Sequence, residues 1–178
     1  TLGPSWQTEG GRLVATSPQT GDESVLRLDC AWDPRVELRP GAINAHTHLY
    51  SGLAPLGMPA PSQPPTNFLE ILQRVWWRLD RALDEESIRA SALVGGMEAL
   101  LSGTTTLVDH HASPNAIDGS LDIVEEALRN LGVRSVLCYE TSDRDGPERA
   151  LAGVVENRRF LDRVRREHLP LARGMVGA

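Results

Sequence analysis

The stretch Pro40-Gly-Ala-Ile-Asn-Ala-His-Thr-His48 decides the fold class of this 178-residue chain. Its apolar letters predict a short strand that ends in two histidines, His46 and His48. Residues i and i+2 of a strand point to the same face, so both imidazoles converge on one point. Two nitrogens at about 2.0–2.1 Å from a common divalent ion need such convergence. We therefore predict a metal site there; the alternative is a pair of hydrogen-bonded histidines in a half-buried strand.

Downstream of this strand, helical and strand patterns alternate along the sequence. Apolar spacing predicts helices over 67–79, 84–102, 117–131 and 148–168, and strands over 42–48, 104–108, 133–139 and 171–176. Such alternation is typical of an α/β protein with a parallel sheet or barrel. Four parallel strands cannot close a barrel, so the pattern predicts the first half of a longer, truncated fold.

Upstream of Pro40 the pattern is different. Short apolar runs broken by Gly, Pro, Ser and Asp predict antiparallel strands and turns. We therefore expect two segments, 1–40 and 41–178. Within the second, five prolines between Tyr50 and Thr66 predict a long loop.

A second polar cluster, Asp109-His110-His111, follows the strand predicted over 104–108. The carboxyl ends of parallel strands form one rim, so this cluster should lie near His46 and His48. Asp109 could bind the free nitrogen of a ligand histidine and fix its tautomer. Alternation along a strand allows one of the two adjacent histidines to face the site. The alternative is an ordinary polar strand end.

Other conspicuous residues are interpreted as structural. Trp76 and Trp77 are expected to pack in the core rather than stack on a ligand. His168 is expected to complement a helix dipole. The arginines of the last helix are expected to form a solvated face: Arg158, Arg159, Arg163, Arg165 and Arg166.

The composition excludes several classes of function. All 18 basic residues are arginine, so the chain has no lysine for a Schiff base, a P-loop or a carbamylated metal bridge. A formal net charge of -6 argues against nucleic-acid binding. Apolar runs fall short of the roughly 20 residues that span a bilayer, so we expect no membrane partner. Two distant thiols, Cys30 and Cys138, favour a reduced, cytoplasmic protein.

Two motifs together resemble a known family. Pro40-Gly-Ala-Ile-Asn-Ala-His-Thr-His-Leu-Tyr50, followed by Gly103-Thr-Thr-Thr-Leu-Val-Asp109, resembles the amidohydrolase superfamily and, within it, the cytosine/guanine deaminase and chlorohydrolase branch. The tract Asp109-His-His-Ala-Ser-Pro114 is similar to aminohydrolases linked to selenium metabolism. The resemblance extends from about Arg39 to the end of the chain.

The resemblance implies a (β/α)8 TIM-type barrel, preceded by part of a small β-sandwich domain, with one divalent metal ion at the barrel mouth. Zinc is expected, with iron as the alternative, and His46 and His48 match two of its ligands. The other ligands and the general acid/base would follow Ala178. Residues 171–178 hold neither the lysine nor the glutamate that bridges two metals in related enzymes, which favours a single ion.

The resemblance also implies a function for the complete protein. We expect a hydrolase acting on a non-peptide C–N or C–Cl bond of a small molecule, with deamination of a nitrogen heterocycle or amidine-like substrate favoured. This chain would supply part of the site and would be inactive alone, and a homo-oligomer is compatible with it. The rival hypotheses are a non-catalytic metal-binding protein that uses His46, His48 and His110 or His111, and an inactive fragment.

Overall fold

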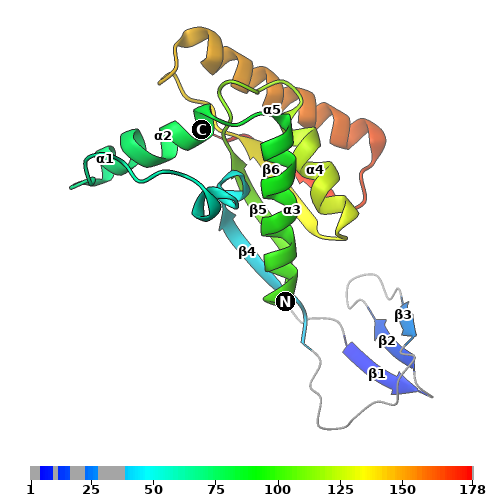
Figure 1. Cartoon of the computed structure of the whole chain (residues 1–178). Helices are drawn as coiled ribbons and strands as arrows, with labels where there is room; N and C mark the ends of the chain where they lie inside the picture. Colours follow the sequence, from blue (N-terminus) through cyan, green and yellow to red (C-terminus); the bar gives the residue numbers. More distant parts are fainter. Residues whose placement is uncertain (1–4, 10–11, 17–22, 28–38, 178) are drawn as a thin grey trace. The chain divides into compact units, whose positions relative to one another are not determined.

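A computed structural model describes residues 5–9, 12–16, 23–27 and 39–177 of the chain (Figure 1). The chain divides into two compact units, Thr1–Pro40 and Gly41–Ala178. In the first, β1 (Ser5–Glu9), β2 (Arg12–Thr16) and β3 (Glu23–Arg27) pair antiparallel in that order. The antiparallel strands agree with the prediction, whereas their assignment to a β-sandwich stays a prediction. Cys30 lies outside the described residues.

The second unit is built on a parallel sheet of four strands. They stand in sequence order: β4 (Ala42–Thr47), β5 (Thr104–His111), β6 (Arg134–Tyr139) and β7 (Ala172–Gly174). Three longer helices connect them: α3 (Glu85–Leu101), α4 (Ser120–Asn130) and α5 (Pro147–Glu167). The predicted α/β alternation is confirmed. The largest differences are β5, which runs on through the polar cluster, and β7, which is shorter than expected.

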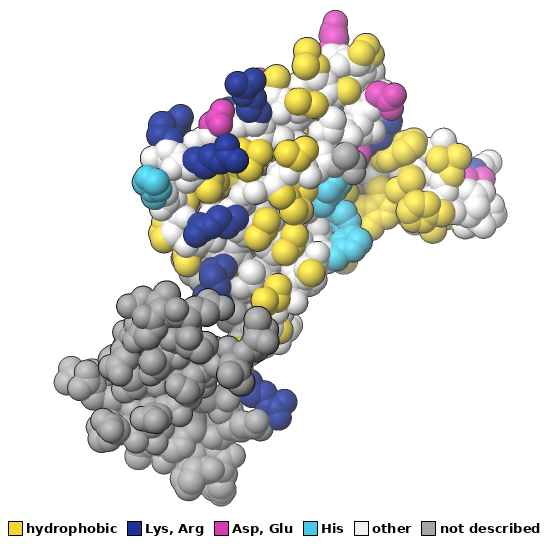
Figure 2. All heavy atoms as spheres, turned by 180° about the vertical axis from the view of Figure 1, so that it is seen from behind, with side chains coloured by type: hydrophobic (Ala, Val, Ile, Leu, Met, Phe, Trp, Pro, Cys, Tyr) yellow, Lys and Arg dark blue, Asp and Glu magenta, His cyan; other side chains and the backbone are white. Residues whose placement is uncertain are grey.

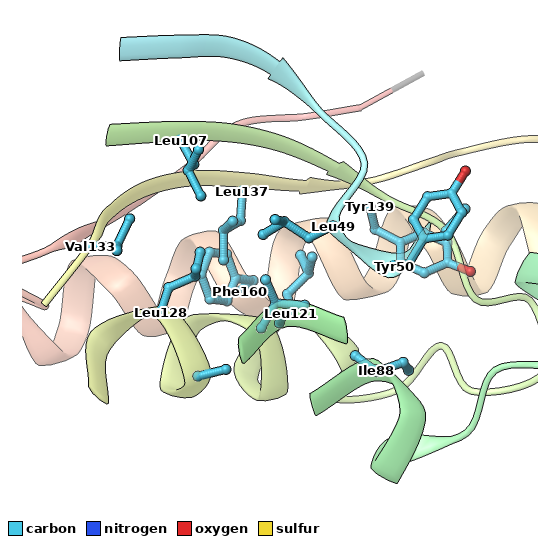
Figure 3. Close-up of a cluster of buried hydrophobic side chains, with 14 of the residues drawn as sticks. Leu49, Tyr50, Ile88, Leu107, Leu121, Leu128, Val133, Leu137, Tyr139 and Phe160 are labelled. Atoms are coloured by element: carbon cyan, nitrogen blue, oxygen red, sulfur yellow. The ribbon is translucent and has the colours of Figure 1, made fainter. Parts of the chain in front are cut away.

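The core lies between the sheet and its helices. Leu107 of β5 and Leu137 of β6 point toward Leu121 and Leu128 of α4 and Phe160 of α5 (Figure 3). Each of these five side chains is 0–1% exposed. Burying such a side chain contributes about 1.5–3 kcal/mol, so this layer fixes the helices behind the strands.

Helix α3 packs closely on its neighbours at two adjacent glycines, Gly95 and Gly96. A Cβ at Gly95 would lie 2.6 Å from Leu49 Cδ2, and one at Gly96 would lie 2.7 Å from Leu131 Cδ1. Asp84 is the N-cap of α3: its carboxylate accepts from the Ser87 backbone N–H at 2.8 Å.

Between β4 and α3 the chain forms a loop and an interrupted helix. The proline-rich loop contains two short 3-10 turns, η1 (Leu49–Ser51) and η2 (Ala54–Leu56). The helix comprises α1 (Phe68–Ile71), a π-helical turn η3 (Leu72–Trp76) and α2 (Trp77–Arg81). We call residues 68–81 the side helix, because α1 and α2 extend to one side of the sheet (Figure 1). Single π-helical turns occur frequently at functional sites.

The arginine face of α5 differs from the prediction. Arg159 and Arg163 both bind Asp122 of α4, at 2.7 and 2.8 Å. Arg159 also binds the buried Glu156, and Arg163 binds the buried Glu125. The predicted solvated face is wrong for Arg163, which is 19% exposed, and holds only in part for Arg159, which is 37% exposed, because Asp122 of α4 faces both arginines across the contact between the helices.

Two further predictions concern the end of helix α5 and the membrane. His168 is exposed and ends α5 with a left-handed backbone, φ 50°, in keeping with a structural role. Among the helices that the structure describes, none is long and apolar enough to cross a membrane.

Candidate metal centre

His46 and His48 meet at the carboxyl end of β4. His46 belongs to the strand, and His48 follows its last residue, Thr47, where the backbone turns into η1. The strand is irregular here, with a register shift against β5 between Asn44 and Thr47. Their Nε2 atoms nevertheless lie only 3.1 Å apart. The predicted convergence of the two imidazoles is present.

The tautomer of His48 follows from its other nitrogen. Nδ1 lies 3.0 Å from the backbone oxygen of His110. A carbonyl oxygen only accepts, so Nδ1 carries the proton and donates. In the neutral ring Nε2 is then a bare lone pair that faces His46, which is the state that a metal ligand requires.

The geometry of the pair fits a metal ion. Two nitrogens at about 2.0–2.1 Å from one ion lie about 2.9–3.4 Å apart for bond angles between square and tetrahedral. The observed 3.1 Å falls in this range. The same distance also permits a direct hydrogen bond between the rings. Within residues 39–177 and the described strands before them, no group of three or more His, Cys, Asp or Glu side chains could hold a metal. The described residues therefore offer two ligands.

Asp109 contacts the residues at the end of β4 and not, as predicted, the free nitrogen of a ligand histidine. Its Oδ1 accepts from the Leu49 backbone N–H at 2.7 Å and from Thr47 Oγ1 at 3.0 Å. The carboxylate thus binds the residues on either side of His48, whereas the tautomer of His48 is set by the His110 carbonyl. Asp109 is fully buried, and burial raises the pKa of its carboxyl to about 6.

The adjacent histidines point to different surroundings, as strand alternation predicts. The His110 ring lies 5.7 Å from the His48 ring and lines a cavity beside the histidine pair. Burial lowers the pKa of His110. His111 is buried, and its Nε2 lies 2.9 Å from Ser113 Oγ. Burial lowers the pKa of His111 to about 3, so this ring is neutral.

A cavity of about 330 Å³ opens beside the histidine pair, and we call it the histidine cavity. Its aromatic lining consists of Tyr50, Phe68, Trp76 and Trp77. The Trp76 ring lies 5.9 Å from the His48 ring. Trp76 packs on the core as predicted, but it also lines the site. Histidines and a group of hydrophobic side chains lie side by side on the face seen in Figure 2.

Two acidic residues complete the lining, Asp80 from the side helix and Glu140 from the end of β6. Arg144 joins them: Nη2 lies 2.6 Å from Asp80 Oδ2 and Nε lies 3.0 Å from Glu140 Oε1. Its guanidinium also lies 5.3 Å from the centre of the Trp77 ring. The sequence did not predict Asp80 and Arg144 as site residues, because no pattern distinguishes them from the other charged residues of the chain.

Comparison with known protein families identifies the family of this chain. Its residues 38–176 match the amidohydrolase family. The chain belongs to that family. Curated amidohydrolase relatives include an 8-oxoguanine deaminase from Pseudomonas aeruginosa, 34% identical over 133 residues, which are 72% of this chain and 28% of the relative. A 5'-deoxyadenosine deaminase from Methanopyrus kandleri is 31% identical over 72% of this chain and 28% of the relative.

Solved structures confirm the amidohydrolase fold. An atrazine chlorohydrolase from Arthrobacter aurescens, complexed with zinc, superposes with a TM-score of 0.56 at 21% identity, over 97% of this chain and 41% of the other. A guanine deaminase from E. coli superposes with a TM-score of 0.55 at 19% identity, over 77% of this chain and 30% of the other. The chain spans about 28% of the length of the two curated relatives above.

Proposed function

We propose that this chain is the first part of a metal-dependent hydrolase that deaminates a nitrogen heterocycle or a related amidine-like substrate. The observation that carries the proposal is the pair of Nε2 atoms, 3.1 Å apart, beside an aromatic-lined cavity. The deaminase names of the curated relatives favour C–N over C–Cl cleavage. Zinc is the proposed ion, because the chlorohydrolase structure was obtained with zinc.

His46 and His48 would hold the ion. A bound zinc ion acidifies water so that hydroxide forms near neutral pH. The His110 carbonyl keeps His48 in the ligand tautomer, and Asp109 holds Thr47 and Leu49 so that the ligand-bearing turn keeps its shape. Such supporting contacts typically change metal affinity 10- to 100-fold when removed.

The aromatic residues of the histidine cavity would bind the flat ring of the substrate. Trp76 and Tyr50 lie edge-to-face with ring centres 6.0 Å apart, and both approach His48. Rings of this kind offer apolar contact and exclude water from the bound heterocycle. The remaining metal ligands and the general acid/base are proposed to follow Ala178. The net charge of -6 supports a small-molecule substrate rather than nucleic acid.

The test is a screen of the protein expressed from its complete gene. A panel of guanine, 8-oxoguanine, adenosine, 5'-deoxyadenosine and atraton is incubated with metal-free and zinc-restored enzyme, and ammonia and methanol are measured. We expect zinc-dependent ammonia release from at least one aminopurine. Stoichiometric zinc binding without turnover of any panel compound would instead support the non-catalytic metal-binding protein.

A further inference from the structure

Asp80, which lines the histidine cavity, has a buried carboxylate oxygen with no hydrogen-bond partner among the described residues. Asp80 is 1% exposed and lines the cavity together with His46 and His48. Its Oδ2 accepts from Arg144 Nη2 at 2.6 Å. Its Oδ1 is buried and has no hydrogen-bond partner among the described residues. A buried carboxylate oxygen left in this state is costly, by about 1–3 kcal/mol or more, so the position favours a donor.

Arg144 does not serve Oδ1, because its three nitrogens face three different carboxylates. Nε donates to Glu140 and Nη2 donates to Asp80 Oδ2, while Nη1 lies 3.6 Å from Asp145 Oδ2. Asp145 is shared with Arg81 at 2.8 Å. Three carboxylates therefore share two guanidinium groups, and no nitrogen of either is bonded to Asp80 Oδ1.

We propose that Asp80 is a specificity-determining residue whose Oδ1 accepts an N–H group of the substrate. The inference rests on the proposed function and narrows it: the substrate carries an N–H besides the amino group that leaves. The ion pair with Arg144 orients the carboxylate before the substrate arrives. The aromatic side chains of the same cavity hold the ring that bears this N–H.

Wild-type enzyme provides the first test. Each panel compound that is turned over is compared with derivatives methylated, one at a time, at every N–H other than the leaving amino group. Hydrogen bonds to charged groups contribute about 1.5–3 kcal/mol, so methylation at one position should lower kcat/KM about 10- to 150-fold. Equal kcat/KM for all derivatives, or turnover only of adenosine or 5'-deoxyadenosine, which carry no N–H besides the leaving amino group, would overturn the inference while leaving the proposed function intact.

The variant Asp80→Asn provides the second test. Arg144 Nη2 only donates, so the amide oxygen should face it and the amide NH2 should occupy the place of Oδ1. The free position then changes from acceptor to donor. We expect the N–H compound to lose about 10-fold or more in kcat/KM, and the preference over its methylated partner to disappear or reverse.

Glu70→Gln is the matched control, since Glu70 also lies on the side helix and binds an arginine, Arg74, but does not line the cavity. It should keep the wild-type preference. An equal loss for both compounds in Asp80→Asn would overturn the inference and leave Asp80 with a positioning role. If Asp80→Asn does not fold, the wild-type series decides alone. Absence of zinc-dependent turnover in wild type would overturn the proposed function itself.

Discussion

Buried His111 should make the protein sensitive to mild acid. Ser113 Oγ donates to the Ala116 backbone oxygen at 2.7 Å, so it accepts from Nε2–H of His111 at 2.9 Å. Nδ1 of this ring is buried and has no partner among the described residues. Burial, with a smaller contribution from His110, lowers the pKa of His111 to about 3, and protonation would place a charged N–H at Nδ1 with no acceptor among the described residues.

The sign and size of the effect follow from linkage. The unfolded ring has a pKa of 6.5, so below this pH the unfolded chain binds a proton that the folded chain does not. The stability that the neutral His111 ring contributes is therefore fully present above pH 6.5 and is lost as the pH falls toward 3. At pH 5 the loss amounts to about 2 kcal/mol, at about 1.4 kcal/mol per pH unit.

The difference in urea unfolding between wild type and His111→Gln, for metal-free protein at pH 7.5, 6 and 5, isolates this loss, because the raised pKa of Asp109 acts with the opposite sign in both proteins. His111→Gln keeps a donor for Ser113 and does not titrate. As the pH falls from 6.5 to 5, its free energy of unfolding should therefore decrease less steeply than that of wild type, and the two slopes should differ by about 1.4 kcal/mol per pH unit. His168→Asn is the control, because His168 is exposed and Asn tolerates its left-handed backbone. Equal slopes for wild type and His111→Gln would refute the reasoning.

Three further predictions concern packing and reactivity. Glu156 accepts the backbone N–H groups of Gly119 and Leu121, and Arg159 would keep its contact with Asp122, so Glu156→Ala should destabilise by about 1–3 kcal/mol in urea unfolding, whereas Glu167→Ala should change little. Gly96→Ala would place a Cβ 2.7 Å from Leu131 Cδ1 and 2.9 Å from Leu128 Cδ2; this overlap costs about 1–3 kcal/mol and offsets the gain in helix propensity of about 1 kcal/mol, so a rise in the unfolding midpoint would contradict the contact. Burial raises the pKa of the Cys138 thiol to about 11, so peptide mapping should find it alkylated by iodoacetamide at pH 8 only after unfolding.

The fold was predictable because it depends on periodic burial. Alternating helical and strand patterns after Pro40 specify a parallel sheet, and a strand that ends in His46 and His48 specifies where two imidazoles meet. Caps and close contacts also have local signals, such as Asp84 before a helix and paired glycines inside one. Each of these rules acts between residues that are near in sequence.

The rest of the site depends on contacts across the chain. Asp80 and Arg144 are 64 positions apart, and neither has a pattern that selects it from the other charged residues. The spacing of Trp76 in the sequence is that of a core residue on a helix. Only the folded chain shows that its ring also lies beside His48. The choice of acceptor for His48 depends on the backbone of β5, which side-chain letters do not encode.

Zinc content tests the central claim most directly. Full-length protein, loaded with zinc and dialysed, is analysed by mass spectrometry of the metal, beside His48→Ala and His168→Asn. We expect about one zinc ion per chain in wild type and His168→Asn, and a loss of most of it in His48→Ala, since this variant removes one of the protein ligands that hold the ion. Full zinc retention in a folded His48→Ala variant would contradict the assignment of His46 and His48 as metal ligands.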